Sequence, residues 1–580
     1  MSTSALNDID LAIRERVQYW LQADFDEDTK REIREMIAHD RKALVDAFYT
    51  NLSFGTGGLR GIMGVGSNRM NVYTVGWATQ GLANYLKTQY PKNEKLRVAI
   101  GYDSRRNSEA FAFRAASVLA ASGITAYLFS ELRPTPLVSF ACRYMHCHAA
   151  IMVTASHNPP NYNGYKVYWN DGAQVLPPHD EAIIREVMRL SDPAAIGTAP
   201  PDHPLIVRMG ADVDAAYLQA ITDAELCTPS ANEHVNILYS SLHGTGITLM
   251  PQALKQFGFR DVALVKQQCI PDPNFPTCPR PNPEEKEALK LGIEQMLREG
   301  HDIFIATDPD ADRVGVVVRH MGEAVILNGN QIACLLVHFI CTHMKLPTKA
   351  AFVKTIVTTE LFRLIVEAHG GRSFDVLTGF KYIAEKIRNW QADPNGPTYV
   401  FGGEESYGYL FGTHVRDKDA IISSCLIAQC ALVAKRQGKT LVDWLNDLYM
   451  EFGLFKEVLI SLNFEESKTG KEAMSGRMKQ YRNAPHTMLA GEKIIRITDL
   501  QTRTVTDCQT GRKEPCDYIE SDVLIWQTET GSKVILRPSG TEPKIKIYLM
   551  LYEPKGFLHL QDAEKNIELK SKKIKDELKL

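Results

Sequence analysis

The sequence contains no long apolar run, no secretory signal and no marked excess of charge of either sign. No apolar segment approaches the roughly 20 residues that a helix needs to cross a bilayer. Residues 1–20 alternate acidic, basic and apolar side chains, without the basic start and apolar core of a signal peptide. We therefore predict a soluble, cytoplasmic protein with no membrane partner.

Cysteine usage and net charge exclude further classes of protein. The 11 cysteines are odd in number and scattered, and none forms a Cys-x-x-Cys pair, so neither a zinc site nor a disulfide framework is indicated. Reduced cysteines suit a cytosolic protein. The 66 Lys+Arg nearly balance the 69 Asp+Glu, giving a net charge of -3. Such a balance gives no indication of a nucleic-acid partner, so we predict none. The sequence does not indicate an oligomeric state.

The chain length and its pattern predict several α/β domains. At 580 residues the chain is too long for one hydrophobic core, and the length suggests about four domains. Apolar strands alternate with helices from about residue 96, which indicates parallel sheets with crossover helices. The expected strands in the first part are 96–100, 124–129 and 149–153, and the expected helices are 109–121 and 136–145.

Proline-rich stretches and a change of pattern suggest the domain boundaries. Residues 192–204 resemble a linker, and a second such segment is 271–283. The expected strands that follow are 235–240, 303–306, 352–356 and 399–401, with helices at 331–344 and 420–435. Beyond residue 455, short strands (534–536, 545–551) mix with helices (468–481, 562–577), which is typical of an α+β domain. We predict a helical extension at 1–50, with a polar joint at 26–30, three α/β domains at 51–205, 206–322 and 323–452, and an α+β domain at 453–580.

Three polar loops directly follow apolar strands. They are residues 154–159 (Thr-Ala-Ser-His-Asn-Pro), 308–313 (Asp-Pro-Asp-Ala-Asp-Arg) and 402–408 (Gly-Gly-Glu-Glu-Ser-Tyr-Gly). In parallel α/β sheets, ligands bind beyond the carboxyl ends of the strands. Their shared placement is therefore more informative than any one of the loops.

Asp308, Asp310 and Asp312 predict a site for a hard cation. Three carboxylates so close in sequence repel one another unless a cation lies among them. Oxygen ligands without His or Cys favour Mg²⁺ or Ca²⁺. The alternative is a solvated acidic turn, whereas an EF-hand is disfavoured because an apolar strand follows at 314–318. Arg313 beside the cluster suits a phosphate that bridges to the metal.

The acidic loop suggests a role for Ser156 in residues 154–159, the serine loop. Most loop serines are turn residues, and no Gly-x-Ser-x-Gly elbow surrounds Ser156. A phosphorylated Ser156, however, would supply the dianion that completes the shell of a magnesium ion held by three aspartates. Lys166 is a candidate acid/base or phosphate ligand, although most lysines are simply solvated. Residues 537–544 (Arg-Pro-Ser-Gly-Thr-Glu-Pro-Lys) offer a guanidinium, hydroxyls and backbone N–H groups to a phosphate, or form an ordinary turn.

In this order, the loops resemble those of the α-D-phosphohexomutase family, which includes phosphoglucomutases and phosphomannomutases. The resemblance runs from Gly55 to about Tyr552, and the N-terminal extension is similar to the longer branch that includes phosphopentomutases. It implies four domains around a central cleft, three of them mixed or parallel α/β and the last α+β.

The resemblance also implies a role for each matching residue. Ser156 corresponds to the phosphoserine and to a Mg²⁺ ligand beside Asp308, Asp310 and Asp312. Lys166 corresponds to the general acid/base, with His157 near the transferred phosphoryl group. The positions that match active-site or substrate-binding residues of the family are Thr56, Arg60, Arg313, Thr378, Glu404, Ser406, Lys418, Arg537, Ser539, Gly540 and Thr541.

The predicted activity is a magnesium-dependent exchange of a phosphoryl group between two positions of one sugar. We expect glucose 1-phosphate and glucose 6-phosphate as substrates, a bisphosphate intermediate, and glucose 1,6-bisphosphate as activator. Mannose and ribose phosphates remain alternatives, because Lys546 and Tyr407 stand where many relatives carry Arg and Phe. A metal-dependent sugar phosphatase would use the same phosphoserine, and a non-catalytic sensor would be expected to lack the serine or an aspartate.

Overall fold

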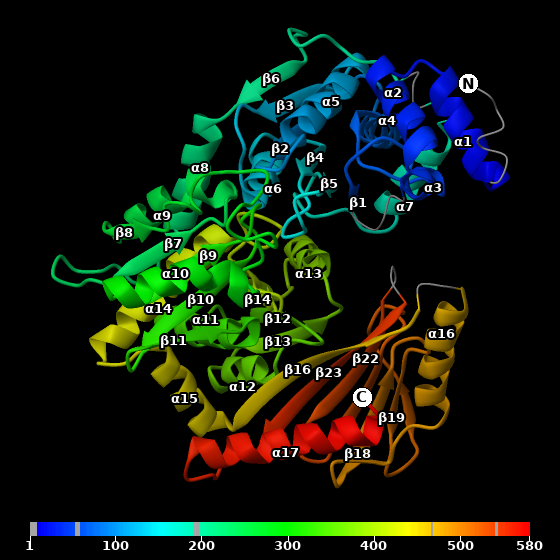
Figure 1. Cartoon of the computed structure of the whole chain (residues 1–580). Helices are drawn as coiled ribbons and strands as arrows, with labels where there is room; N and C mark the ends of the chain where they lie inside the picture. The colour runs from blue at the N-terminus through cyan, green and yellow to red at the C-terminus, as the bar shows by residue number, and fades with distance from the viewer. Residues whose placement is uncertain (1–8, 53–57, 191, 193–195, 466–467, 540–542) are drawn as a thin grey trace. The chain divides into compact units, whose positions relative to one another are not determined.

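The computed structural model describes residues 9–52, 58–190, 192, 196–465, 468–539 and 543–580. The chain divides into two compact units (Figure 1). The first consists of Met1–Asn328, Ala384–Gly396 and Ser406–Leu432, and the second of Gly329–Ile383, Pro397–Glu405 and Val433–Leu580. In the described part of the chain, no helix is both long and apolar enough to cross a membrane.

Three helices form the N-terminal part of the first unit: α1 (Leu11–Gln22), α2 (Glu27–His39) and α3 (Arg41–Phe48). Their apolar faces enclose a small core that contains Trp20 stacked on Phe25. The prediction that residues 26–30 form a polar joint between two helices is wrong. Asp26 is the N-cap of α2, where its carboxylate accepts from the Thr29 N–H at 2.8 Å, and residues 27–30 are the first turn of the helix.

The first sheet of this unit has the order β1-β5-β4-β2-β3-β6. Strands β4, β2, β3 and β6 are parallel, whereas β5 runs antiparallel to both β4 and β1. The sheet is therefore mixed, which agrees with the predicted mixed or parallel α/β domain. Its strands are β1 (Gly58–Ile62), β2 (Arg97–Tyr102), β3 (Thr125–Phe129), β4 (Ala149–Val153), β5 (Tyr162–Trp169) and β6 (Ile206–Met209).

Helices cover this sheet because its central strands are apolar on both faces. All five residues of β4 are buried, and its bounds match the predicted strand residue for residue. The helices are α4 (Val72–Gln89), α5 (Ser108–Ala121), α6 (Thr135–Tyr144) and α7 (His179–Met188). In β5 the side chains alternate between the two faces. The Tyr165 hydroxyl lies 3.0 Å from Thr79 Oγ1 of α4, and the next residue, Lys166, points to the other side.

The second sheet of the first unit has the order β11-β10-β9-β7-β8 and is also mixed. Strand β9 is fully buried, pairs in parallel with β7 and lies antiparallel to β10. The strands are β7 (Ile237–Ser240), β8 (Val262–Leu264), β9 (Ile303–Thr307), β10 (Val314–His320) and β11 (Glu323–Leu327). Around them lie α8 (Ala211–Thr222), the short 3₁₀ helix η3 (Thr245–Thr248), α9 (Met250–Gln256) and α10 (Lys286–Glu299). Strand β15 (Gly408–Phe411) also belongs to this unit.

The second unit begins with a parallel arrangement. Strand β12 (Ala350–Thr355) pairs in parallel with β13 (Arg372–Val376) and β14 (Thr398–Glu404). The helices of this part are α11 (Gly329–His343) and α12 (Glu360–Ala368). The boundary between the units falls within α13 (Phe380–Ala392) and α14 (Ala420–Arg436), and α15 (Leu441–Phe452) follows in the second unit.

The C-terminal part of the second unit is built on an antiparallel sheet of order β16-β23-β22-β21-β18-β19-β20, with β17 paired to β18. Helix α17 packs along strand β23 (Figure 1). This architecture confirms the predicted fold class of several α/β sheets followed by an α+β domain. The elements are β16 (Leu454–Asn463), α16 (Lys468–Asn483), β17 (Met488–Leu489), β18 (Glu492–Asp499), β19 (Thr504–Asp507), β20 (Lys513–Pro515), β21 (Leu524–Thr528), β22 (Lys533–Pro538), β23 (Lys544–Glu553) and α17 (Leu560–Leu578).

Candidate active site

Ser156 lies in the loop that follows β4, with its backbone in the left-handed region at φ +53°. Few residues other than glycine adopt this conformation, and it is common at functional sites. The Ser156 N–H donates to Thr154 Oγ1 at 2.8 Å, and the serine is 3% exposed. The loop therefore presents a buried hydroxyl in one defined direction.

Arg105, in the segment that follows the adjacent strand β2, holds this loop. Its guanidinium donates to the backbone carbonyls of Ser156 and Asn158, and also to those of Pro159 and Tyr162 at 2.9 and 3.1 Å. Asp103 balances the charge, because its Oδ2 lies 3.2 Å from Arg105 Nε and both side chains are fully buried. The conformation of the serine loop therefore depends on a buried ion pair.

The acidic loop follows β9 and lies next to the serine loop. Asp308, Asp310 and Asp312 are 0, 0 and 2% exposed, and one carboxylate oxygen of each lies within 4.8 Å of the others. The Ser156 hydroxyl donates to Asp308 Oδ2 at 2.7 Å. Asp308 Oδ1 accepts from the backbone N–H groups of Asp312 and Arg313 at 3.1 and 3.0 Å. The two loops predicted to cooperate therefore meet in one buried cluster.

The loop that follows β7 supports the acidic loop from behind. Thr245 donates its N–H and its hydroxyl to the Pro309 carbonyl, at 2.7 and 2.9 Å. Gly244 allows this approach, because a Cβ atom at that position would lie 2.2 Å from Pro309 Cα. The backbone of the acidic loop is therefore fixed by neighbours that belong to the same sheet.

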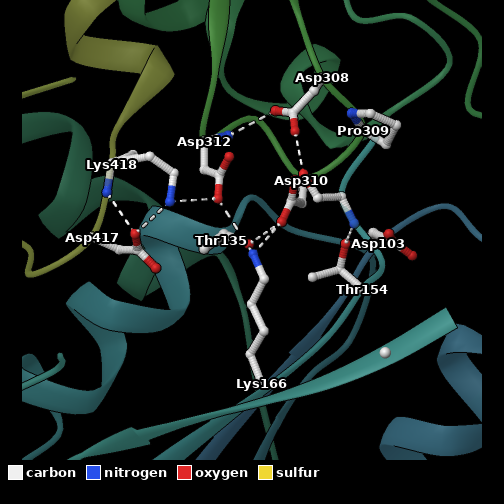
Figure 2. A network of polar contacts seen from close by, with 12 residues as sticks. Asp103, Thr135, Thr154, Lys166, Asp308, Pro309, Asp310, Asp312, Asp417 and Lys418 are labelled. Atoms are coloured by element: carbon white, nitrogen blue, oxygen red, sulfur yellow. Dashed lines mark hydrogen bonds and ion pairs between the residues drawn. The ribbon is translucent and has the colours of Figure 1, made fainter. Parts of the chain in front are cut away.

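Two lysines, Lys166 and Lys418, form ion pairs with the aspartates of the acidic loop (Figure 2). Lys166 Nζ lies 2.8 Å from Asp310 Oδ2 and 3.3 Å from Asp312 Oδ2. Lys418 Nζ lies 3.2 Å from Asp312 Oδ2 and 2.9 Å from Asp417 Oδ1. Lys166 is a buried residue of β5, so the general expectation of a solvated lysine does not apply to it.

The pKa values in the cluster respond to burial and to these charges. Burial raises the pKa of Asp308 well above its usual range, and Asp310 and Asp312 raise it further. Burial acts in the same direction on Asp310, but Lys166 outweighs it and lowers the pKa of that carboxyl. Burial alone would lower the pKa of Lys166, but Asp310 and Asp312 raise it. The lysine is therefore held as an ammonium ion by the aspartates.

The unused oxygen atoms of the cluster suit a hard cation. Asp310 Oδ1 and Asp312 Oδ1 are buried and accept no hydrogen bond from the residues that the structure describes, although Asp312 Oδ1 lies 3.9 Å from Arg313 Nε. Buried carboxylate oxygens are costly unless they are paired or coordinate a metal ion. The donor set contains oxygen atoms only, as Mg²⁺ and Ca²⁺ prefer. The residues present therefore fit the predicted metal.

Basic side chains lie on the serine side of the cluster. The Ser156 hydroxyl is 3.0 Å from His157 Nδ1. Burial, with Arg313 and Arg60 nearby, lowers the pKa of His157 to about 2, so the imidazole is neutral. Arg60 donates to Asn158 Oδ1 at 3.3 Å, and Arg313 donates to Glu284 Oε1 at 2.8 Å. The structure thus gathers His157, Arg60 and Arg313 around the predicted phosphoserine.

The remaining predicted residues fall in different places. In the second unit, the Gly379 N–H donates to Glu404 Oε1 at 2.9 Å, which places Thr378 beside Glu404. Glu404 is the last residue of β14, and Arg537 lies within β22, so neither belongs to a loop as expected. Ser539 donates its N–H to the Lys544 carbonyl at 2.8 Å, and Ser406 belongs to the first unit. Thr56, Gly540 and Thr541 lie outside the described residues.

Sequence reasoning missed Arg105, which contacts the serine loop, and Thr135 and Thr245, which contact the acidic loop. Arg105 lies in a polar run directly after β2, and Thr135 follows β3 within Pro-Thr-Pro. Both follow parallel strands of the same sheet as β4. The rule that ligands gather at the carboxyl ends of strands, applied to every strand, would have identified them.

Comparison with known proteins shows the family of the chain. Residues 51–193, 215–322 and 328–452 match the families described as phosphoglucomutase/phosphomannomutase, alpha/beta/alpha domains I, II and III. A phosphoglucomutase of Staphylococcus haemolyticus (strain JCSC1435) is 36% identical over 509 residues, covering 87% of this chain and 91% of that protein. One of Staphylococcus aureus (strain MRSA252) is 36% identical over 512 residues, covering 88% and 91%.

Solved structures share the fold at low sequence identity. A phosphoglucomutase/phosphomannomutase family protein from Burkholderia thailandensis has a TM-score of 0.67 at 17% identity, covering 91% of this chain and 97% of that one. The pp63/parafusin phosphoglucomutase from Paramecium, in its open form, has a TM-score of 0.65 at 17% identity, covering 91% and 96%. The domain matches and the similarity to the two Staphylococcus enzymes show that the chain belongs to the phosphoglucomutase/phosphomannomutase family, the α-D-phosphohexomutases.

Proposed function

We propose that this chain interconverts glucose 1-phosphate and glucose 6-phosphate, with Ser156 as the phosphoryl carrier. The observation that carries the proposal is the 2.7 Å hydrogen bond from the Ser156 hydroxyl to Asp308, within a buried group of three aspartates. The relatives named phosphoglucomutase support glucose as the sugar. A phosphate on Ser156 would lie beside carboxylates that suit a divalent cation and beside the basic groups of Arg60 and Arg313.

The proposed reaction consists of two phosphoryl transfers. In the first, the bond between Ser156 Oγ and phosphorus breaks as a free sugar hydroxyl forms a bond to the same phosphorus, which yields a hexose bisphosphate. The proton of the attacking hydroxyl is taken up by the enzyme, and the Ser156 oxygen is protonated. The bisphosphate then turns around, and its other phosphoryl group returns to Ser156 by the reverse chemistry. Phosphate is conserved, so no co-reactant is consumed.

The residues of the first unit have three proposed roles: acid/base, metal ligand and phosphate ligand. Lys166 is our candidate acid/base, because it is buried and in hydrogen-bond contact with the acidic loop. Asp308, Asp310, Asp312 and the phosphate of Ser156 would hold Mg²⁺. When bound, this ion would offset the negative charge of the transferring phosphoryl group, as is general in phosphoryl transfer. His157 and the guanidinium groups of Arg60 and Arg313 would orient the phosphate of Ser156.

The proposal extends to substrate recognition, to the domain boundaries and to location. We assign sugar or distal-phosphate contacts to the other matching residues, namely Thr56, Thr378, Glu404, Ser406, Lys418, Arg537, Ser539, Gly540 and Thr541. Glucose 1,6-bisphosphate would act as activator by phosphorylating Ser156. We retain the α/β domains at 51–205, 206–322 and 323–452 and the α+β domain at 453–580. A cytoplasmic location agrees with 11 free cysteines.

A coupled assay tests the proposal. Initial rates on the 1-phosphates of glucose, mannose, glucosamine and ribose, each with its bisphosphate activator, should be highest for glucose. Ser156→Ala should abolish turnover, whereas Ser122→Ala, a half-buried loop serine of the same unit, should not change it. Mass spectrometry should find one phosphate on the peptide that contains Ser156. Inorganic phosphate as the main product would identify a phosphatase, and full turnover of the Ser156→Ala protein would refute the mechanism.

A further inference from the structure

We propose that Thr135 is a positioning residue that aims one oxygen of Asp310 at the metal ion. This inference rests on the metal site of the proposed function and adds a residue from the first sheet to it. Thr135 is the first residue of helix α6, which follows β3, whereas Asp310 lies in the loop after β9 of the second sheet. The contact therefore joins segments that are 175 residues apart.

Thr135 contacts Asp310 at two points. Its backbone N–H donates to the Asp310 carbonyl at 2.8 Å, and its hydroxyl donates to Asp310 Oδ2, also at 2.8 Å. Thr135 and Asp310 are both 0% exposed, so water does not compete for either bond. Figure 2 shows Thr135 and Lys166 converging on the same carboxylate oxygen. Both the backbone and the side chain of Asp310 are therefore held.

The position of Thr135 in the helix makes the first contact possible. The N–H groups of the first turn have no acceptor within their own helix, so they are available to other segments. No side chain caps the start of α6, and the N–H of Thr135 uses the Asp310 carbonyl as its acceptor. Pro136 occupies the next position, where a missing N–H costs nothing. The Thr-Pro start of α6 thus directs a donor at the acidic loop.

The second contact decides which oxygen of Asp310 is left for a cation. Oδ2 accepts from Thr135 Oγ1 and from Lys166 Nζ, both at 2.8 Å, while Oδ1 is buried and has no donor within the described ranges. A carboxylate held in this way cannot rotate without breaking two buried hydrogen bonds. Partners of this kind fix the orientation of a metal ligand, and their loss typically lowers metal affinity 10–100-fold.

A matched set of variants separates this role from simple stabilisation. Thr135→Val removes the hydroxyl and keeps the shape and the N–H, whereas Thr135→Ser keeps the hydroxyl. Thr79→Val is the control, because Thr79 is also 0% exposed in the first unit and its hydroxyl bonds to Val75 O and Tyr165, away from the aspartates. Thr135→Ala serves if the valine variant does not fold.

Mn²⁺ affinity, measured by electron paramagnetic resonance with the full-length unphosphorylated protein, gives a readout that does not depend on turnover. We expect Thr135→Val to bind Mn²⁺ about 10-fold more weakly than the unmodified protein, and Thr135→Ser to restore most of the affinity. Thr79→Val should lower the thermal unfolding midpoint without changing Mn²⁺ affinity. The same 10-fold shift should appear in the Mg²⁺ concentration that gives half-maximal turnover.

Two outcomes would overturn the inference, and they differ in what else they refute. If Thr135→Val and Thr79→Val both unfold at lower temperature but bind Mn²⁺ as the unmodified protein does, Thr135 only joins the two sheets. The proposed function would stand in that case. If the unmodified protein binds Mn²⁺ in neither its unphosphorylated nor its phosphorylated form, the metal site is wrong, and with it both the role of Thr135 and the magnesium chemistry of the proposed function.

Discussion

The hydroxyl of Ser156 donates to Asp308 at 2.7 Å across a sequence separation of 152 residues. One partner follows β4 of the first sheet, and the other follows β9 of the second. The carboxyl ends of β4 and β9 meet here. The serine loop and the acidic loop, which stand far apart in the sequence, therefore form one site.

Asp310→Asn removes one negative charge from the acidic cluster and keeps the shape of the side chain. We expect magnesium-dependent turnover to fall at least about 100-fold, because a direct ligand matters no less than its supporting partners. Circular dichroism should show an unchanged fold. Asp202→Asn, at an exposed position of the first unit, is the control and should be neutral. Equal rates in the two variants would exclude Asp310 from the metal site.

Arg105→Lys keeps the charge opposite Asp103 but lacks the planar fork that reaches several carbonyls. The variant should lose roughly 1.5–3 kcal/mol of stability, the range for hydrogen bonds to charged groups, and should turn over more slowly because the Ser156 loop is released. Denaturant unfolding and the coupled assay measure the two effects. The neighbour Arg106→Lys is the control, since Arg106 is exposed. If the two variants behave alike, Arg105 does not hold the loop.

Gly244→Ala tests the support behind the acidic loop. The backbone of Gly244 has φ -102°, so alanine is sterically acceptable in itself, but its Cβ would lie 2.2 Å from Pro309 Cα. We expect a loss of about 1–3 kcal/mol and weaker Mn²⁺ binding, because the loop must move. Gly476→Ala, at an open position of helix α16, should instead be neutral or gain about 0.5–1 kcal/mol. Unaltered metal affinity in Gly244→Ala would contradict this account.

Glu457 in β16 predicts a dependence of stability on pH. Burial raises its pKa from 4.5 to about 7, against hydrogen bonds from Thr359 and Asn330. Below pH 4.5 the carboxyl is protonated in both the folded and the unfolded chain, so it costs nothing. Between pH 4.5 and 7 only the unfolded chain releases the proton, so stability falls as pH rises. The loss is complete above about pH 7.

Glu457→Gln should remove this slope and raise the thermal unfolding midpoint at pH 8, by an amount equivalent to about 1–3 kcal/mol. At pH 4 the variant and the unmodified protein should unfold at similar temperatures. Glu568→Gln replaces an exposed glutamate of α17 and should leave the slope in place. A slope that persists in Glu457→Gln would assign the pH dependence to other groups.

The strands that carry the site were predictable because they are short, apolar and followed by polar loops. The predicted strand at 149–153 is β4, and the strand at 303–306 lies within β9. The direction of β5, β10 and β11 was not predictable, because alternation of strands and helices indicates crossovers and does not reveal hairpins within a mixed sheet. Strand β10 in particular returns antiparallel to β9 directly after the acidic loop.

Within the site, sequence reasoning predicted the groups that carry charge and missed those that orient them. Asp308 and its neighbours stand out as a pattern, and the structure brings them to Ser156 and Lys166. Arg105 contacts the backbone of the serine loop, and Thr135 contacts both the backbone and the carboxylate of Asp310. Neither residue belongs to a motif, and only its position after a strand could have indicated it.

The pairing of β5 limits the insertions and deletions that this strand can accept. Lys166 lies opposite Gly58 of β1 and opposite Met152 of β4, while Tyr165 points to the other face and reaches Thr79. Inserting or deleting a single residue between 162 and 166 would exchange these faces, turning the ammonium group into the apolar core. Changes of two residues would preserve the face. In this strand, therefore, only insertions or deletions of an even number of residues keep Lys166 on the face of the acidic cluster.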